Sequence, residues 1–123
     1  MNEGNIRSTT DAGLDLDRLR ELADDNPAEV RSLVELYLQQ TEQQLSQMRA
    51  AIQSHSADTL GRVAHSCAGA SATCGMTPMV NPLKELEKRA RSGTLDGADE
   101  WHQKALAEFA RIRAALNQVT NAC

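Results

Sequence analysis

The run AHSCAGASATCG, residues 64–75, places one nucleophilic side chain, His65, among residues that are almost all small. On an α-helix of about 3.6 residues per turn, the positions three and four away from it hold Gly61, Arg62, Ala68 and Gly69. Helical side chains lean toward the N-terminus, so a large residue at position 69 would cover the ring. The small side chains of Ala68 and Gly69 leave the imidazole open, and the run predicts a helix that presents one histidine.

The apolar positions of this run predict which way His65 points. At about 100° per residue, one side of the helix collects Leu60, Val63, Cys67, Ala70, Ser71 and Cys74. His65 lies roughly 170° from the centre of that arc, so we expect it to face solvent. Helices rich in small residues also occur where two helices pack closely, and a packed or capping histidine is the alternative.

The ordinary pKa of a histidine side chain is about 6.5, so an exposed imidazole is largely neutral at physiological pH and can act as a nucleophile. Metal binding is not expected, because His65 and Cys67, two residues apart, diverge on a helix. We expect His55 and His102 to be solvent-exposed and without a role. The sequence contains no glycine-rich phosphate loop.

Five segments carry helical periodicity. A short one spans 14–22, and a long one starts at Asn26-Pro27, where Asn can cap and Pro fits the first helical position. Its buried stripe is Val30, Val34, Tyr37, Thr41, Leu45, Met48 and Ile52. The His65 segment follows, then one that begins at Thr77 or at Asn81-Pro82, because Pro82 disfavours an early start. The last runs to Val119.

These segments predict an all-α protein, an antiparallel four-helix bundle with a short additional N-terminal helix. We expect a flexible leader at 1–13, one bundle domain at 14–119 and a frayed tail at 120–123. With one Trp, one Tyr and one Phe in 123 residues, the core must be aliphatic.

The formal net charge of −4 gives no general attraction to nucleic acid. No apolar stretch approaches the roughly 20 residues needed to span a bilayer, so we expect a soluble, cytoplasmic protein that does not bind membranes. Three cysteines do not suggest a disulfide framework.

The run His65-Ser66-Cys67-Ala68-Gly69-Ala70-Ser71, followed by Gly75 and Leu86-Glu87, resembles the His-x-x-Lys-Gly-Ser-Ser signature of histidine-containing phosphotransfer (HPt) domains. The order of helical segments is similar over most of the chain. The resemblance implies that His65 accepts a phosphoryl group from an aspartyl phosphate on a receiver domain and passes it to another receiver. The chain would then be a phosphoryl carrier without autonomous kinase activity.

The resemblance also implies the partners and the cofactor. We expect response-regulator receiver domains as partners, with a hybrid sensor histidine kinase as a further candidate, and a monomeric chain. The receiver would supply Mg²⁺, and this chain would hold no metal or cofactor of its own. Leu36 falls off the buried stripe of the long helix and Leu38 lies at its edge, so either is a candidate docking residue or simply an exposed apolar residue.

Ala68 departs from the signature, which has lysine there. Arg62, one turn before His65, could partly replace that charge, and Lys84 and Lys88 are further candidates whose reach depends on the fold. The departure also motivates the alternative of a phosphorylation-incompetent docking module that binds a receiver or another signalling protein. A plain helical scaffold would be favoured if His65 were buried.

Overall fold

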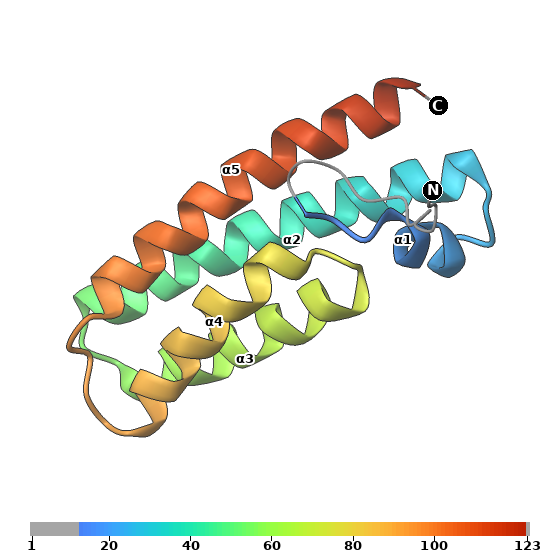
Figure 1. Ribbon diagram of the computed structural model, residues 1–123. Coiled ribbons are helices and arrows are strands. Elements are labelled where there is room, and N and C mark those ends of the chain that lie inside the picture. Colours follow the sequence, from blue (N-terminus) through green and yellow to red (C-terminus); the bar gives the residue numbers. More distant parts are fainter. Residues whose placement is uncertain (1–12, 123) are drawn as a thin grey trace, which may run out of the picture.

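The computed structural model describes residues 13–122, which form five helices and no strand. The helices are α1 (Leu16–Leu22), α2 (Pro27–Gln53), α3 (Ala57–Thr73), α4 (Thr77–Arg91) and α5 (Ala98–Ala122). The long helices α2 and α5 lie alongside each other, and the shorter α3 and α4 form a hairpin against them (Figure 1). The predicted all-α four-helix bundle with a short N-terminal helix is confirmed.

The residues at the starts of α2 and α4 can be compared with the predicted helix starts. The Asn26 side chain accepts hydrogen bonds from the backbone N–H groups of Ala28 and Glu29, and Pro27 occupies the first turn of α2, as predicted. Of the two predicted starts, α4 uses Thr77 and contains Pro82. Pro82 lies in the second turn, where it removes the N–H group that would donate to the carbonyl of residue 78.

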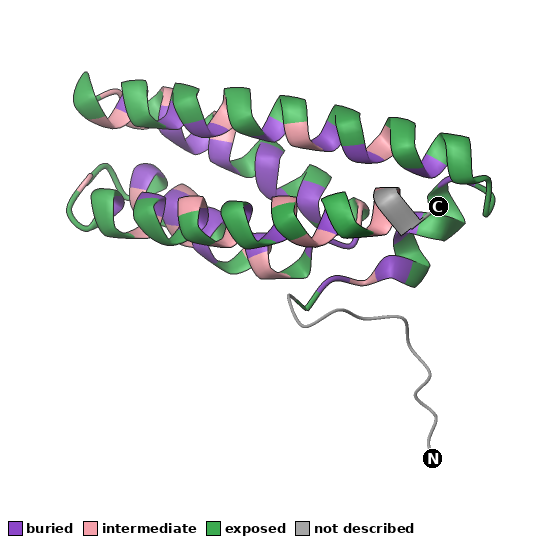
Figure 2. Cartoon of the chain, turned by 90° about the horizontal axis from the view of Figure 1, so that it is seen from above, coloured by how far each residue is buried: buried purple, intermediate pink, exposed green. Residues whose placement is uncertain are grey.

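The core is mostly aliphatic and lies between α2, α3, α4 and α5, whose outer faces are exposed (Figure 2). The α2 stripe is buried as predicted, except that Ala51 is buried and Ile52 is only partly so. One polar pair crosses this core: the hydroxyls of Tyr37 on α2 and Ser71 on α3 lie 2.8 Å apart. Burial raises the pKa of Tyr37, and it does the same to the neighbouring thiol of Cys67, to about 11. Both side chains are therefore neutral.

The α3–α4 hairpin is held close by small residues. A Cβ atom placed on Gly61 would lie 3.3 Å from the Cβ of Ala90, so the two backbones approach each other at this point. At the other end of the hairpin, the N-terminal segment docks on the connecting turn: Asp15 N–H donates to the Gly75 carbonyl at 2.8 Å, and Arg18 Nε donates to the Thr73 carbonyl at 3.0 Å.

Two predicted boundaries concern the chain ends. The predicted leader, 1–13, lies outside the described residues except for Gly13. Helix α5 continues to Ala122, past the boundary predicted at Val119, and the Thr120 hydroxyl donates to the Leu116 carbonyl at 3.2 Å. None of the helices described is long and apolar enough to cross a membrane.

Candidate functional site

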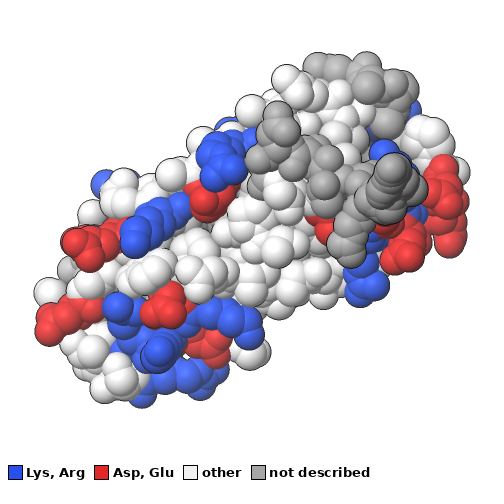
Figure 3. Space-filling model, viewed as in Figure 1, with Lys and Arg blue, Asp and Glu red and all other residues white. Residues whose placement is uncertain are grey.

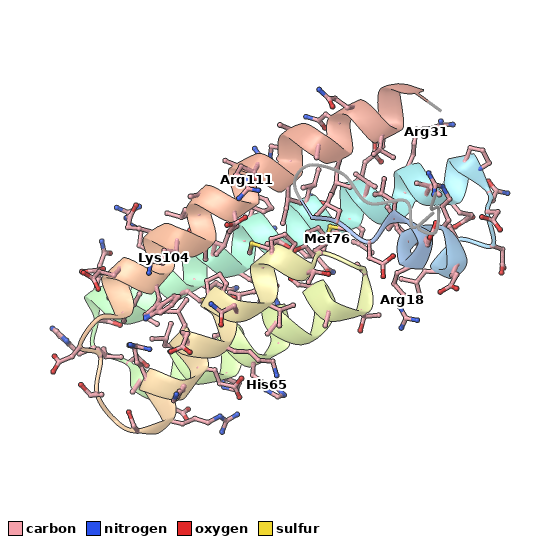
Figure 4. The ribbon with its side chains drawn as sticks, viewed as in Figure 1. Arg18, Arg31, His65, Met76, Lys104 and Arg111 are labelled. Atoms are coloured by element: carbon pink, nitrogen blue, oxygen red, sulfur yellow. The ribbon has the colours of Figure 1, made fainter. Side chains whose placement is uncertain are left out.

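His65 lies in the middle of α3 with 68% of its side chain exposed. Figure 4 shows it on the side of the α3–α4 hairpin that faces away from α5. The predicted outward orientation is confirmed. The plain-scaffold alternative required a buried histidine and is therefore not supported.

The ring of His65 is oriented by Glu87 on α4, one oxygen of which (Oε2) lies 2.8 Å from the histidine Nδ1. An ionised carboxylate only accepts hydrogen bonds, so Nδ1 must carry the proton. In the neutral ring, the lone pair is then on Nε2, the nitrogen farther from α4. The contact thus selects the tautomer in which Nε2 carries the lone pair.

Arg91, one turn after Glu87 on α4, donates from Nε to the same Oε2 at 2.8 Å. The Glu87 side chain is only 15% exposed. Partial burial by itself raises the pKa of this carboxyl, but the hydrogen bonds from Arg91 and His65 outweigh it and hold the pKa below its ordinary value. Glu87 is therefore ionised near neutral pH and able to accept the Nδ1 proton.

The small residues beside His65 divide into two groups. Gly69 is open, because a Cβ atom added there meets nothing within 4 Å. Ala68, predicted to lie beside the open imidazole, is buried at 3% exposure, and Ala70, predicted on the buried arc, is exposed. The buried face of α3 is turned toward α4, because Gly61 and Ala64, too small to register as apolar positions, are core residues of the hairpin.

Three further cationic side chains lie on α3 and α4. Arg62, Lys84 and Lys88 are all exposed, and Arg62 and Arg91 both line a hollow of about 540 Å³ between the start of α3 and the end of α4. The hollow is lined by Ala57, Asp58, Gly61, Arg62, Ala90 and Arg91. On the face seen in Figure 3, basic and acidic side chains gather over the end of the hairpin, whereas the surface over its middle is mostly uncharged.

The two candidate docking leucines differ in how far they are exposed. Leu36 on α2 is 50% exposed, whereas Leu38 packs against the core and is a poor candidate. Gln44, eight residues after Leu36 on α2 and rotated from it by about 80°, donates to the hydroxyl of Ser66 at 3.4 Å, so this flank of α2 borders the helix that carries His65.

The other histidines are not equivalent to His65. His55 is exposed with a φ of 57°, as expected of a turn residue. His102 was expected to be exposed but is 3% exposed, and its Nε2 donates to the Leu45 carbonyl at 2.9 Å. The reason is that α5 places it against α2. Over residues 13–122, no three His, Cys, Asp or Glu side chains form a group that could hold a metal.

A family model for the Hpt domain matches residues 32–122. The chain belongs to the Hpt domain family. Its fold is similar to the crystal structure of histidine-containing phosphotransfer protein B (HptB) from Pseudomonas aeruginosa PAO1, with a TM-score of 0.86 and 29% sequence identity. The similarity covers 93% of this chain and 99% of that one. A comparison with curated proteins finds no match.

An Hpt domain is a histidine phosphotransfer module of a phosphorelay and a carrier rather than a kinase. This Hpt domain adds two site residues without a role in the sequence analysis, Glu87 and Arg91. Glu87 appeared in the sequence analysis only as part of the family resemblance, and its spacing of four residues from Arg91 is typical of a helical ion pair. Only the register of α4 against α3 shows that the pair meets His65.

Proposed function

We propose that this chain is a phosphorelay intermediate that accepts a phosphoryl group on His65 Nε2 from a receiver-domain aspartyl phosphate and passes it to another receiver. The observation that carries the proposal is the 2.8 Å contact between Nδ1 and Glu87, which leaves an exposed Nε2 with the free lone pair. The partners are receiver domains, including that of a hybrid sensor kinase, and the chain acts as a monomer.

In the proposed transfer, the Nε2 lone pair forms a bond to phosphorus while the bond from phosphorus to the aspartyl oxygen breaks. The bonding electrons leave with the carboxylate, and the imidazole ring becomes positively charged. Glu87 stabilises that charge through the proton on Nδ1. Transfer to the next receiver reverses these changes, with Mg²⁺ and the acidic catalytic residues belonging to the receiver.

We place the docking surface on the exposed faces of α2 and α3 around His65. Leu36 provides an apolar contact at one end, and Gly69 leaves the surface between it and the ring without a side chain. A receiver that presents an apolar surface beside its aspartate could approach His65 without displacing a side chain of the bundle.

The test is incubation with phosphorylated receiver domains, followed by acid and alkali treatment of the transferred label. We expect a label that is lost in acid and stable in alkali, as for phosphohistidine, and none on His65→Gln. His55→Asn is the matched control, because His55 is exposed and asparagine tolerates a positive φ. Label on the His65 variant would refute the assignment.

A docking-only module is the second candidate, and Ala68 is the residue that favours it. That reading predicts a complex with receivers but no transferred label, and gain of labelling in Ala68→Lys. Because Ala68 is buried, the added lysine must extend along the α4 surface to reach solvent.

A further inference from the structure

A phosphoryl group on Nε2 creates an electrostatic problem at this site. The group carries up to two negative charges, and the ionised Glu87 carboxylate lies on the other side of the same ring. A cation near Nε2 would offset both. On α3, the position three residues after His65, where the family signature has lysine, holds Ala68, which is buried and uncharged.

The opposite helix offers an equivalent position. The His65–Glu87 and Gly61–Ala90 contacts show that α3 and α4 run antiparallel, with residue 87 across from 65 and residue 90 across from 61. Side chains on α4 lean toward its own N-terminus, so a residue at 91 covers the level of 87, directly across from His65. That residue is Arg91.

We propose that Arg91 is the cation that holds the phosphoryl group of phosphorylated His65, a role that rests on the proposed function. Its Nε and the histidine Nδ1 share Glu87 Oε2, each at 2.8 Å, so these two nitrogens are no farther apart than twice that length. The Arg91 side chain is 63% exposed. No hydrogen bond from its terminal nitrogens to any residue in 13–122 is present, so four N–H groups are available for phosphoryl oxygens.

The other nearby cations are placed less well. Arg62 leans toward the start of α3 and Lys84 toward the start of α4, in both cases away from the level of His65. Lys88 is rotated about 100° from Glu87 around α4. Arg91 also lowers the cost of placing a carboxylate near a phosphoryl group, because it neutralises Glu87.

The experiment compares Arg91→Ala, Arg91→Lys and Arg62→Ala with the wild type. Each is labelled from a phosphorylated receiver and, separately, from phosphoramidate, a small donor that needs no docking. Transfer rate and the lifetime of the isolated phosphohistidine are measured at low and high salt. We expect Arg91→Ala to reduce the rate or the lifetime about three- to tenfold at low salt, with a smaller effect at high salt. Arg91→Lys should recover part of the loss, and Arg62→Ala should change little.

A structural effect is distinguished by thermal melting, in which Arg91→Ala should lose no more stability at pH 7 than its exposed ion pair with Glu87 contributes and should stay fully folded under the assay conditions. Equal rates and lifetimes in wild type and Arg91→Ala, or a larger loss in Arg62→Ala, would overturn the assignment to Arg91 while His65 remained the acceptor. A wild type that takes no label from either donor would refute the proposed function and this role with it.

Discussion

At the scale of single residues, the reactivity proposed for His65 depends on which ring nitrogen carries the proton. Glu87 decides this because it is a hydrogen-bond acceptor held ionised by Arg91. The three side chains form one chain of contacts through a single oxygen, so a change at one alters the other two.

The lowered pKa of Glu87 predicts a pH dependence of stability. A carboxyl whose pKa is lower in the folded than in the unfolded state stabilises the fold above its unfolded pKa, and this contribution is lost as pH falls through the folded pKa. We therefore expect Glu87→Gln to lower the melting temperature at pH 7 and to differ less from wild type as pH falls below about 4.3. A melting difference that is constant from pH 7 to pH 3 would contradict this.

A second property at this scale is how easily a partner can reach the ring of His65. Gly69→Leu should keep the fold and add roughly 0.5 to 1 kcal/mol of helix stability, since leucine is a better helix former than glycine and position 69 is open. Phosphoryl transfer from a receiver should nevertheless fall sharply, because the new side chain leans over His65. Gly69→Ala is the control: it gains similar stability but adds only a methyl group. Equal transfer rates in both variants would mean that partners do not approach across position 69.

At the scale of elements, the sequence predicted the helices more completely than it predicted the site. A long period of three and four residues defines the α2 stripe without any knowledge of partners. Glu87 joins His65 only because α3 and α4 pair in one register, and that register depends on Gly61 and Ala90. Residues with almost no side chain cannot be recognised as core positions in a hydrophobic pattern, so this register could not be predicted from the sequence. The burial of His102 was not predicted for a related reason. Its hydrogen-bond partner, the Leu45 carbonyl, lies 57 residues away in the sequence, and only the packing of α5 on α2 brings the two together.

The hydrogen bond between Tyr37 and Ser71 links α2 to the helix that carries His65. Tyr37→Phe and Ser71→Ala should each destabilise the fold by about 1 kcal/mol, and the double variant by less than the sum of the two. Denaturant unfolding of the four proteins measures this coupling. Transfer at His65 should stay normal under native conditions, because the pair is on the buried side of α3. Strict additivity would indicate that the hydroxyls do not interact in solution.

At the scale of the whole molecule, the N-terminal segment completes the fold although the family match begins only at residue 32. Leu14 and Leu19 are buried, and the segment is fixed to the α3–α4 turn at Gly75, whose φ is +81°. The contact closes the end of the hairpin opposite the Arg62–Arg91 hollow.

This attachment predicts a difference between two glycines. Gly75 and Gly93 both have φ near +80°, so alanine at either position costs about 1 to 2 kcal/mol of backbone strain. A Cβ atom on Gly75 would also meet the Asp15 carbonyl, whereas one on Gly93 meets nothing within 4 Å. We expect Gly75→Ala to lower the free energy of unfolding clearly more than Gly93→Ala. Equal losses would show that the N-terminal segment is not held at Gly75 in solution.

The close approach of Gly61 to Ala90 has a kinetic meaning for a chain that relays phosphoryl groups. The two residues set the separation of α3 and α4, and this separation sets the length of the contact between His65 and Glu87. A larger side chain at position 61 pushes the helices apart, weakens the preference for one tautomer and leaves every reactive group in place. We therefore expect a larger residue at position 61 to slow phosphoryl transfer, so that natural variation there would change the timing of a pathway without changing its chemistry.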